Sequence, residues 1–134
     1  MLDHATLIRQ CLISAMKDDA PVNDLLGERV YDQVDASAAW PFGRFDPPDM
    51  VRYESSCGNG WDMEWRLHLF ARGPGTKKTN ELNTKVFSAL FESELSIPEL
   101  SRFDIDFVRS NTGPDGDEVN DYHNVVVFRT VTVE

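Results

Sequence analysis

The chain has 134 residues, 41% of them hydrophobic and 27% charged, which favours one folded domain over residues 1–134 and excludes a disordered chain. Its formal net charge is −10, from 23 acidic and 13 basic residues, and this excludes a protein that grips nucleic acid by neutralising phosphates. No apolar run approaches the ~20 residues that a membrane span needs. The first residues also lack the order of a secretory signal.

The first 31 residues predict two helices and a short extended segment. Asp3 is a candidate N-cap, and apolar residues then follow at helical spacing as far as Met16. Residues 19–21 end this helix and start a short second one that reaches Leu26, with Gly27 as its C-cap. Residues 29–31 look extended.

Residues 35–50, DASAAWPFGRFDPPDM, predict a long loop or an irregular edge strand. Three prolines and a glycine interrupt three aromatic residues, Trp40, Phe42 and Phe45. We expect these aromatic side chains to be exposed on the chain itself and to be covered by a neighbouring subunit or partner protein. The alternative is that they fold back onto the core of their own chain.

The segment WDMEWRLHLFAR, residues 61–72, predicts a half-buried strand. Its odd positions are apolar, whereas its even positions are polar until Phe70 breaks the pattern. The Asn-Gly pair at 59–60 predicts a hairpin with a short strand over residues 51–55. The polar face, which includes Glu64, Arg66 and His68, lines a catalytic cleft, faces solvent or meets a partner.

The second half of the chain predicts a helix and two more strands. The helix runs from about Thr76 to Glu92, and residues 103–107 alternate as a half-buried strand. Residues 111–121 look like a polar loop, and residues 124–133 form a valine-rich last strand. The predicted fold class is α+β, with an antiparallel sheet of about four to five strands and two main helices packed on one face.

The sequence motifs that could carry chemistry predict no cofactor, no metal site and no enzymatic activity. GPGTKKT at 73–79 fails the phosphate-loop pattern, and DGDEVND at 115–121 lacks the glycine of a calcium loop. The three histidines show no zinc-like spacing. Cys11 and Cys57 are interpreted as free thiols of a cytosolic protein, a single disulfide being the alternative. No local motif supports a Cys57–histidine pair.

Three stretches follow one another along the chain: LLGERVYDQVD, WRLHLFARGPGTKKTNELNTKVFSALF and YHNVVVFRTVTVE. Their order resembles the tail-completion proteins, or tail terminators, of long-tailed phages and related prophages or gene transfer agents. LLGERVYDQVD, from Leu25 to Asp35, is similar to a family phrase of the form LVGDRVYDRVP. WRLHLFARGPGTKKTNELNTKVFSALF matches the family's strand and helix, and YHNVVVFRTVTVE matches its last strand. The departure is at residues 40–60, where WPFGRFDPPDM replaces a simpler segment.

The resemblance implies a structural virion protein without catalytic residues, located at the head-proximal end of the tail and assembled in the host cytoplasm. It implies a homo-oligomer, a ring of six copies, that caps the tail tube, ends its polymerisation and meets head–tail connector or neck proteins. DNA would pass the lumen without specific binding, and no membrane is involved. Rival interpretations are another neck, head-completion or tail-tube subunit, or a small enzyme or ligand-binding domain.

Six residues are candidates for contact with a neighbouring subunit or partner: Trp40, Phe42, Phe45, Glu64, Arg66 and His68. Aromatic residues are enriched at interface cores. The polar strand face would meet the ring lumen or a neighbouring subunit. Six copies at −10 carry −60, and a lumen with part of that charge would repel DNA.

Overall fold

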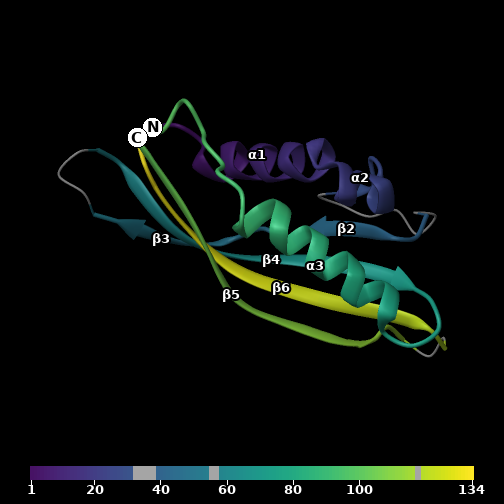
Figure 1. Cartoon of the computed structure of the whole chain (residues 1–134). Coiled ribbons are helices and arrows are strands. Elements are labelled where there is room, and N and C mark those ends of the chain that lie inside the picture. The colour runs from purple at the N-terminus through teal and green to yellow at the C-terminus, as the bar shows by residue number, and fades with distance from the viewer. Residues whose placement is uncertain (32–38, 55–57, 117–118) are drawn as a thin grey trace.

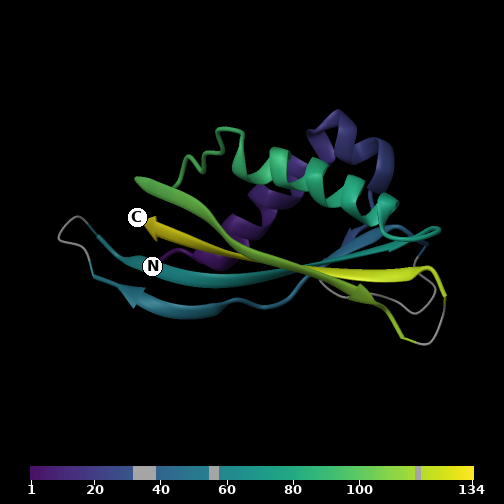
Figure 2. The same ribbon diagram turned by 60° about the horizontal axis from the view of Figure 1, so that its bottom comes forward.

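The computed structural model describes residues 1–31, 39–54, 58–116 and 119–134, and its helices lie on one face of a twisted sheet (Figures 1 and 2). This confirms the α+β class. In chain order the elements are α1 (His4–Asp18), α2 (Ala20–Leu26), β1 (Val30–Tyr31), β2 (Phe42–Phe45), β3 (Asp49–Tyr53), β4 (Gly60–Arg72), α3 (Lys77–Phe91), β5 (Arg102–Pro114) and β6 (Asp121–Val133). The sheet has six strands, one more than the upper end of the predicted range.

Strand β4 organises the sheet, whose order is β1-β2-β4-β6-β5, with β3 also paired to β4. On one side, β4 pairs with β6 along its whole length, from Gly60 opposite Val133 to Arg72 opposite Asp121. On the other side, β3 pairs with residues 60–64 and β2 with residues 67–70. All these pairs are antiparallel, and only β1 and β2 run parallel. The predicted hairpin of β3 and β4 is confirmed.

Two predicted loops are shorter than expected. Of the described residues 39–50, half are strand, because β2 and the start of β3 lie within them, and residues 32–38 are outside the described residues. The loop predicted at 111–121 is wrong at its start, since β5 continues to Pro114 with Asn111 opposite Val125. An edge strand with exposed side chains needs no apolar alternation, so its polar end resembles a loop in the sequence.

The predicted helix ends are confirmed. The carboxylate of Asp3 accepts a hydrogen bond from the backbone N–H of Thr6 at 3.0 Å, which caps α1. Asp19 caps α2 in the same way by accepting from the N–H of Val22 at 3.1 Å. Gly27 ends α2 at φ +57°, a conformation that glycine adopts without a steric cost.

The core lies between the helices and the odd positions of β4. Trp65 and Phe128 stack there with ring centroids 6.1 Å apart, and both are fully buried. The indole N–H of Trp65 donates to the Thr130 hydroxyl at 3.0 Å, so the one polar atom of this ring is satisfied. The other large buried side chains of the core include Ile8, Leu12, Met16, Leu26, Met63, Leu67, Leu69, Leu82 and Leu90.

We expect Trp65→Ala to lower the free energy of unfolding by about 3–5 kcal/mol, because it empties a buried site and leaves the Thr130 hydroxyl without its partner. Chemical denaturation monitored by circular dichroism measures this. The control is Lys85→Ala, which breaks only an exposed pair with Glu81 and should change stability by about 0.5 kcal/mol or less. A loss for Trp65→Ala as small as the control's would contradict the assigned core.

Candidate interaction surfaces

The sheet face that the helices leave uncovered, here the open face, is rich in charge but balanced. It carries the even positions of β4 and the strand residues that pair with them. Its strands hold six basic and six acidic residues: Arg44, Arg66, Arg72, Arg102, Arg109 and Arg129, with Asp49, Asp62, Glu64, Asp104, Asp106 and Asp121. The net charge of −10 therefore comes from elsewhere in the chain.

Cross-strand and same-strand ion pairs cover this face. Arg66 contacts Glu64 at 3.2 Å and Asp49 at 3.6 Å, so two of the candidate residues pair with each other. Arg129 makes two hydrogen bonds to Asp62, which lower the pKa of that carboxyl group. Exposed pairs of this kind add at most about 1 kcal/mol each. Their main effect is to leave few unpaired charges on the face.

His68 lies within a hydrogen-bonded chain rather than free on the surface. Its Nε2 is 2.7 Å from the carboxylate of Asp46, and its Nδ1 is 2.6 Å from Nε2 of His123. If both rings are neutral, His68 donates to Asp46 and His123 donates to His68. Burial and the neighbouring His68 lower the pKa of His123. Only 12% of the His68 side chain is exposed.

Aromatic rings continue this chain along the open face. Phe70 stacks on His123 with centroids 4.3 Å apart and on Phe42 at 4.5 Å. Trp40 meets Phe70 edge-on at 5.8 Å, and the guanidinium of Arg72 lies 4.2 Å from the Trp40 ring. We call Trp40, Phe42, Asp46, His68, Phe70 and His123 the aromatic–histidine cluster. The break in alternation at Phe70 was its only sequence signal.

The structure corrects the expectation that all three aromatic residues of segment 35–50 are exposed. Phe45 is 2% exposed and packs edge-on against Trp65 in the core, and Phe42 is 6% exposed. Trp40 is partly buried within the aromatic–histidine cluster. The alternative of folding back onto the same chain therefore holds for Phe42 and Phe45. Subunit contact through these residues, or through Glu64, Arg66 and His68, stays a prediction.

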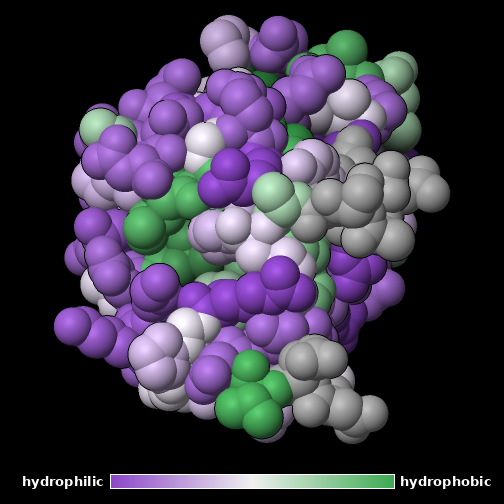
Figure 3. Space-filling model, turned by 90° about the vertical axis from the view of Figure 1, so that its right-hand side faces the viewer, coloured by the Kyte–Doolittle hydropathy of each residue, from purple (hydrophilic) through white to green (hydrophobic). Residues whose placement is uncertain are grey.

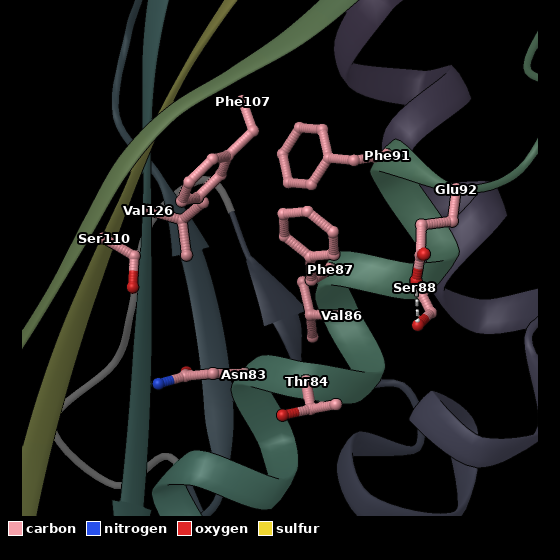
Figure 4. A pocket seen from close by; sticks show the side chains of 10 residues that line it. All are labelled: Asn83, Thr84, Val86, Phe87, Ser88, Phe91, Glu92, Phe107, Ser110 and Val126. Carbon is pink, nitrogen blue, oxygen red and sulfur yellow. Dashed lines mark hydrogen bonds between the residues drawn. The ribbon is translucent and has the colours of Figure 1, made fainter.

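A groove between α3 and β5 is lined largely by apolar side chains (Figure 4). The rings of Phe87, Phe91 and Phe107 meet in it, with Phe87 and Phe107 at 5.1 Å. Phe87 and Phe107 are 36% and 40% exposed, which is high for phenylalanine. The end of the molecule with the β4–α3 turn is mostly hydrophilic, with a hydrophobic area near the middle of this face (Figure 3).

Within the described residues, no group of three or more histidine, cysteine, aspartate or glutamate side chains is placed to hold a metal ion. Over the same residues, no helix is long and apolar enough to cross a membrane. Cys11 is a free thiol whose pKa is raised by burial. Cys57, and with it a Cys57–histidine pair or a disulfide, lies outside the described residues.

We expect the stability of the chain to fall between pH 7 and pH 5 in a way that depends on His123. Its pKa in the fold lies below the ordinary value of about 6.5, so below that pH the unfolded chain binds a proton that the folded chain does not. Denaturation curves should show a smaller loss for His123→Gln. Asp3 and Asp62, whose pKa values are also lowered, act only below about pH 4. Equal pH profiles for the two proteins would contradict this assignment.

Comparisons with known proteins support the observed fold and also show the family of the chain. The family model described as tail completion protein gp17 matches residues 10–133. The chain is similar to one in the virion of a native gene transfer agent particle, with a TM-score of 0.83 and 18% identity over 100% of both chains. It is also similar to the bacteriophage SPP1 gp17 protein, with a TM-score of 0.67 and 15% identity over 98% of this chain and 91% of that one. No curated protein matches the sequence. Because the family model spans nearly the whole chain, the protein belongs to the tail completion protein gp17 family and is a structural component of the virion tail.

Proposed function

We propose that copies of this chain form a closed ring, with six the expected number, that caps the head-proximal end of the tail tube. The ring ends polymerisation of the tube and joins it to the head or neck. One observation carries the proposal: the chain matches, over its full length, a chain that is part of an assembled gene transfer agent virion. Membership in a tail completion family supports the same role.

The sheet suits a subunit of a ring because its two edges differ. One edge is formed by β3 and β1, and the other by β5. When two different surfaces of one chain meet head to tail, successive copies are related by a rotation, and the series closes into a ring if that rotation is a whole fraction of a full turn without a translation along the axis. The full chain, residues 1–134, would act as one such unit. Its partners would be the tail tube protein and the connector or neck proteins.

Passage of DNA through the ring is consistent with the charge on the open face. Of its six arginines, five lie beside a carboxylate, namely Arg44, Arg66, Arg72, Arg102 and Arg129. An arginine already paired gains little by binding a phosphate, and an overall charge of −10 per copy repels DNA. If the open face lines the lumen, it would let DNA slide without binding. The role is structural and needs neither a cofactor nor catalysis.

Deletion of the coding sequence from a particle-producing host tests this role. We expect DNA-filled heads and separate tails of irregular length, because nothing ends the tube or joins it to the head. Electron microscopy of the lysate measures both features, and the wild-type chain supplied in trans should restore joined particles. Absence of tails would indicate a tube subunit instead. Normal particles would contradict any role in tail completion.

A further inference from the structure

The exposed apolar side chains of the described strands and helices gather at two opposite edges of the sheet. The first group, the β3 patch, is Met50 and Val51, which are 44% and 66% exposed. The second, the α3–β5 patch, is Phe87, Phe107 and Val108. The β3 patch lies on one outer strand of the run β3-β4-β6-β5, and β5 is the other. Each copy therefore carries two different apolar edges.

Strand directions decide how two copies can meet. Both β3 and β6 run antiparallel to β4, and β5 runs antiparallel to β6, so β3 and β5 have opposite directions. A head-to-tail arrangement that preserves strand direction thus puts β3 of one copy antiparallel to β5 of the next. The outer edge of β5 has no strand partner in the described chain, so its backbone groups are open to such pairing.

We propose that β3 of one copy pairs with β5 of the next and places Met50 at the α3–β5 groove. Met50 lies opposite the buried Met63 on β4, and cross-strand neighbours share a face, so Met50 is on the helix-covered side. Phe107 is on the same side, where it meets Phe91 of α3. This inference rests on the proposed ring and names its subunit contact.

The charged residues of the open face support a pairing of β3 with β5 in which Met50 lies beside Phe107. Asp49 lies opposite Glu64 and is 77% exposed at its side chain, with only a 3.6 Å contact to Arg66. Arg109 is exposed, and it is the one open-face arginine for which the described residues offer no ion pair. An antiparallel pair with Met50 beside Phe107 brings Asp49 toward Arg109.

The bulge in β5 makes both contacts compatible. In an unbroken strand, Phe107 and Arg109 would share one face, because side chains alternate. The register shift between Phe107 and Arg109 leaves Val108 as an extra residue and puts Arg109 on the open face, opposite Val127. Adjacent residues Asp49 and Met50 of the incoming strand can then meet Arg109 on one face and Phe107 on the other.

A mixing experiment tests the proposal. Met50→Asp disables the β3 patch and Phe107→Asp disables the α3–β5 patch, and both positions are exposed, so the variants should keep the wild-type circular dichroism. Alone, each should associate at least 100-fold more weakly than the wild type in sedimentation velocity. Mixed in equal amounts, they should form a one-to-one dimer and nothing larger, since one intact edge remains on each chain. Val119→Asp, at an apolar position outside both patches, should assemble like the wild type.

Other outcomes separate the failure of this contact from the failure of the ring. If both variants assemble normally, or only Phe107→Asp is affected, the contact is overturned while the ring stands. If the wild-type chain stays monomeric even on purified tail tubes, the ring and this contact both fall. If an aspartate variant misfolds, the same measurements are made with Met50→Ser and Phe107→Ser instead.

A charge exchange between Asp49 and Arg109 tests the register of the pairing between β3 and β5. Asp49→Arg and Arg109→Asp should each weaken assembly about tenfold, and the chain with both changes should recover most of it. Failure of the double variant to recover would overturn the assigned register.

Discussion

The structure depends on a sheet that is covered on only one face. α1 and α3 supply one layer of apolar side chains, and the odd positions of β4, with the residues opposite them on β6, supply the other. Because one face of the sheet packs on the core and the other is in contact with water, β4 alternates apolar and polar residues along nearly its whole length. The same arrangement leaves both outer edges of the sheet accessible, which a subunit of an assembly can use and a monomer must protect.

The open face is nearly balanced in charge although the whole chain is strongly acidic. Five of its six arginines pair with carboxylates of the same chain, as between Arg129 and Asp62 or Arg72 and Asp121. The acidic excess comes from the helices and connecting segments, for example Asp18 and Asp24 in the first two helices and Glu92 and Glu94 after α3. The paired charges therefore lie on the open face, whereas the excess negative charge lies on the helices and connecting segments. The local pairing leaves few unpaired positive charges on the open face, so that this face does not form a phosphate-binding surface.

The parts of the fold that depend on local periodicity could be predicted from the sequence. β4, α3, the caps at Asp3 and Gly27 and the break between the first two helices at residues 19–21 follow from residue spacing and capping chemistry. The aromatic–histidine cluster does not, because it requires the register that brings Phe70 opposite His123 and the position of Asp46 just after β2. The four residues of β2 were obscured by prolines on both sides of the strand. The polar half of β5 was missed because pairing at an edge needs only backbone groups.

The most direct measurement of the central claim is a cryo-electron microscopy reconstruction of the head–tail junction of particles that contain this chain. We expect a closed ring of copies with this fold, one layer thick, at the head-proximal end of the tail tube. The density should show β3 of each copy beside β5 of the next. Finding this chain along the whole tube, inside the head or at the distal tip of the tail would contradict the proposed role as the cap of the tube.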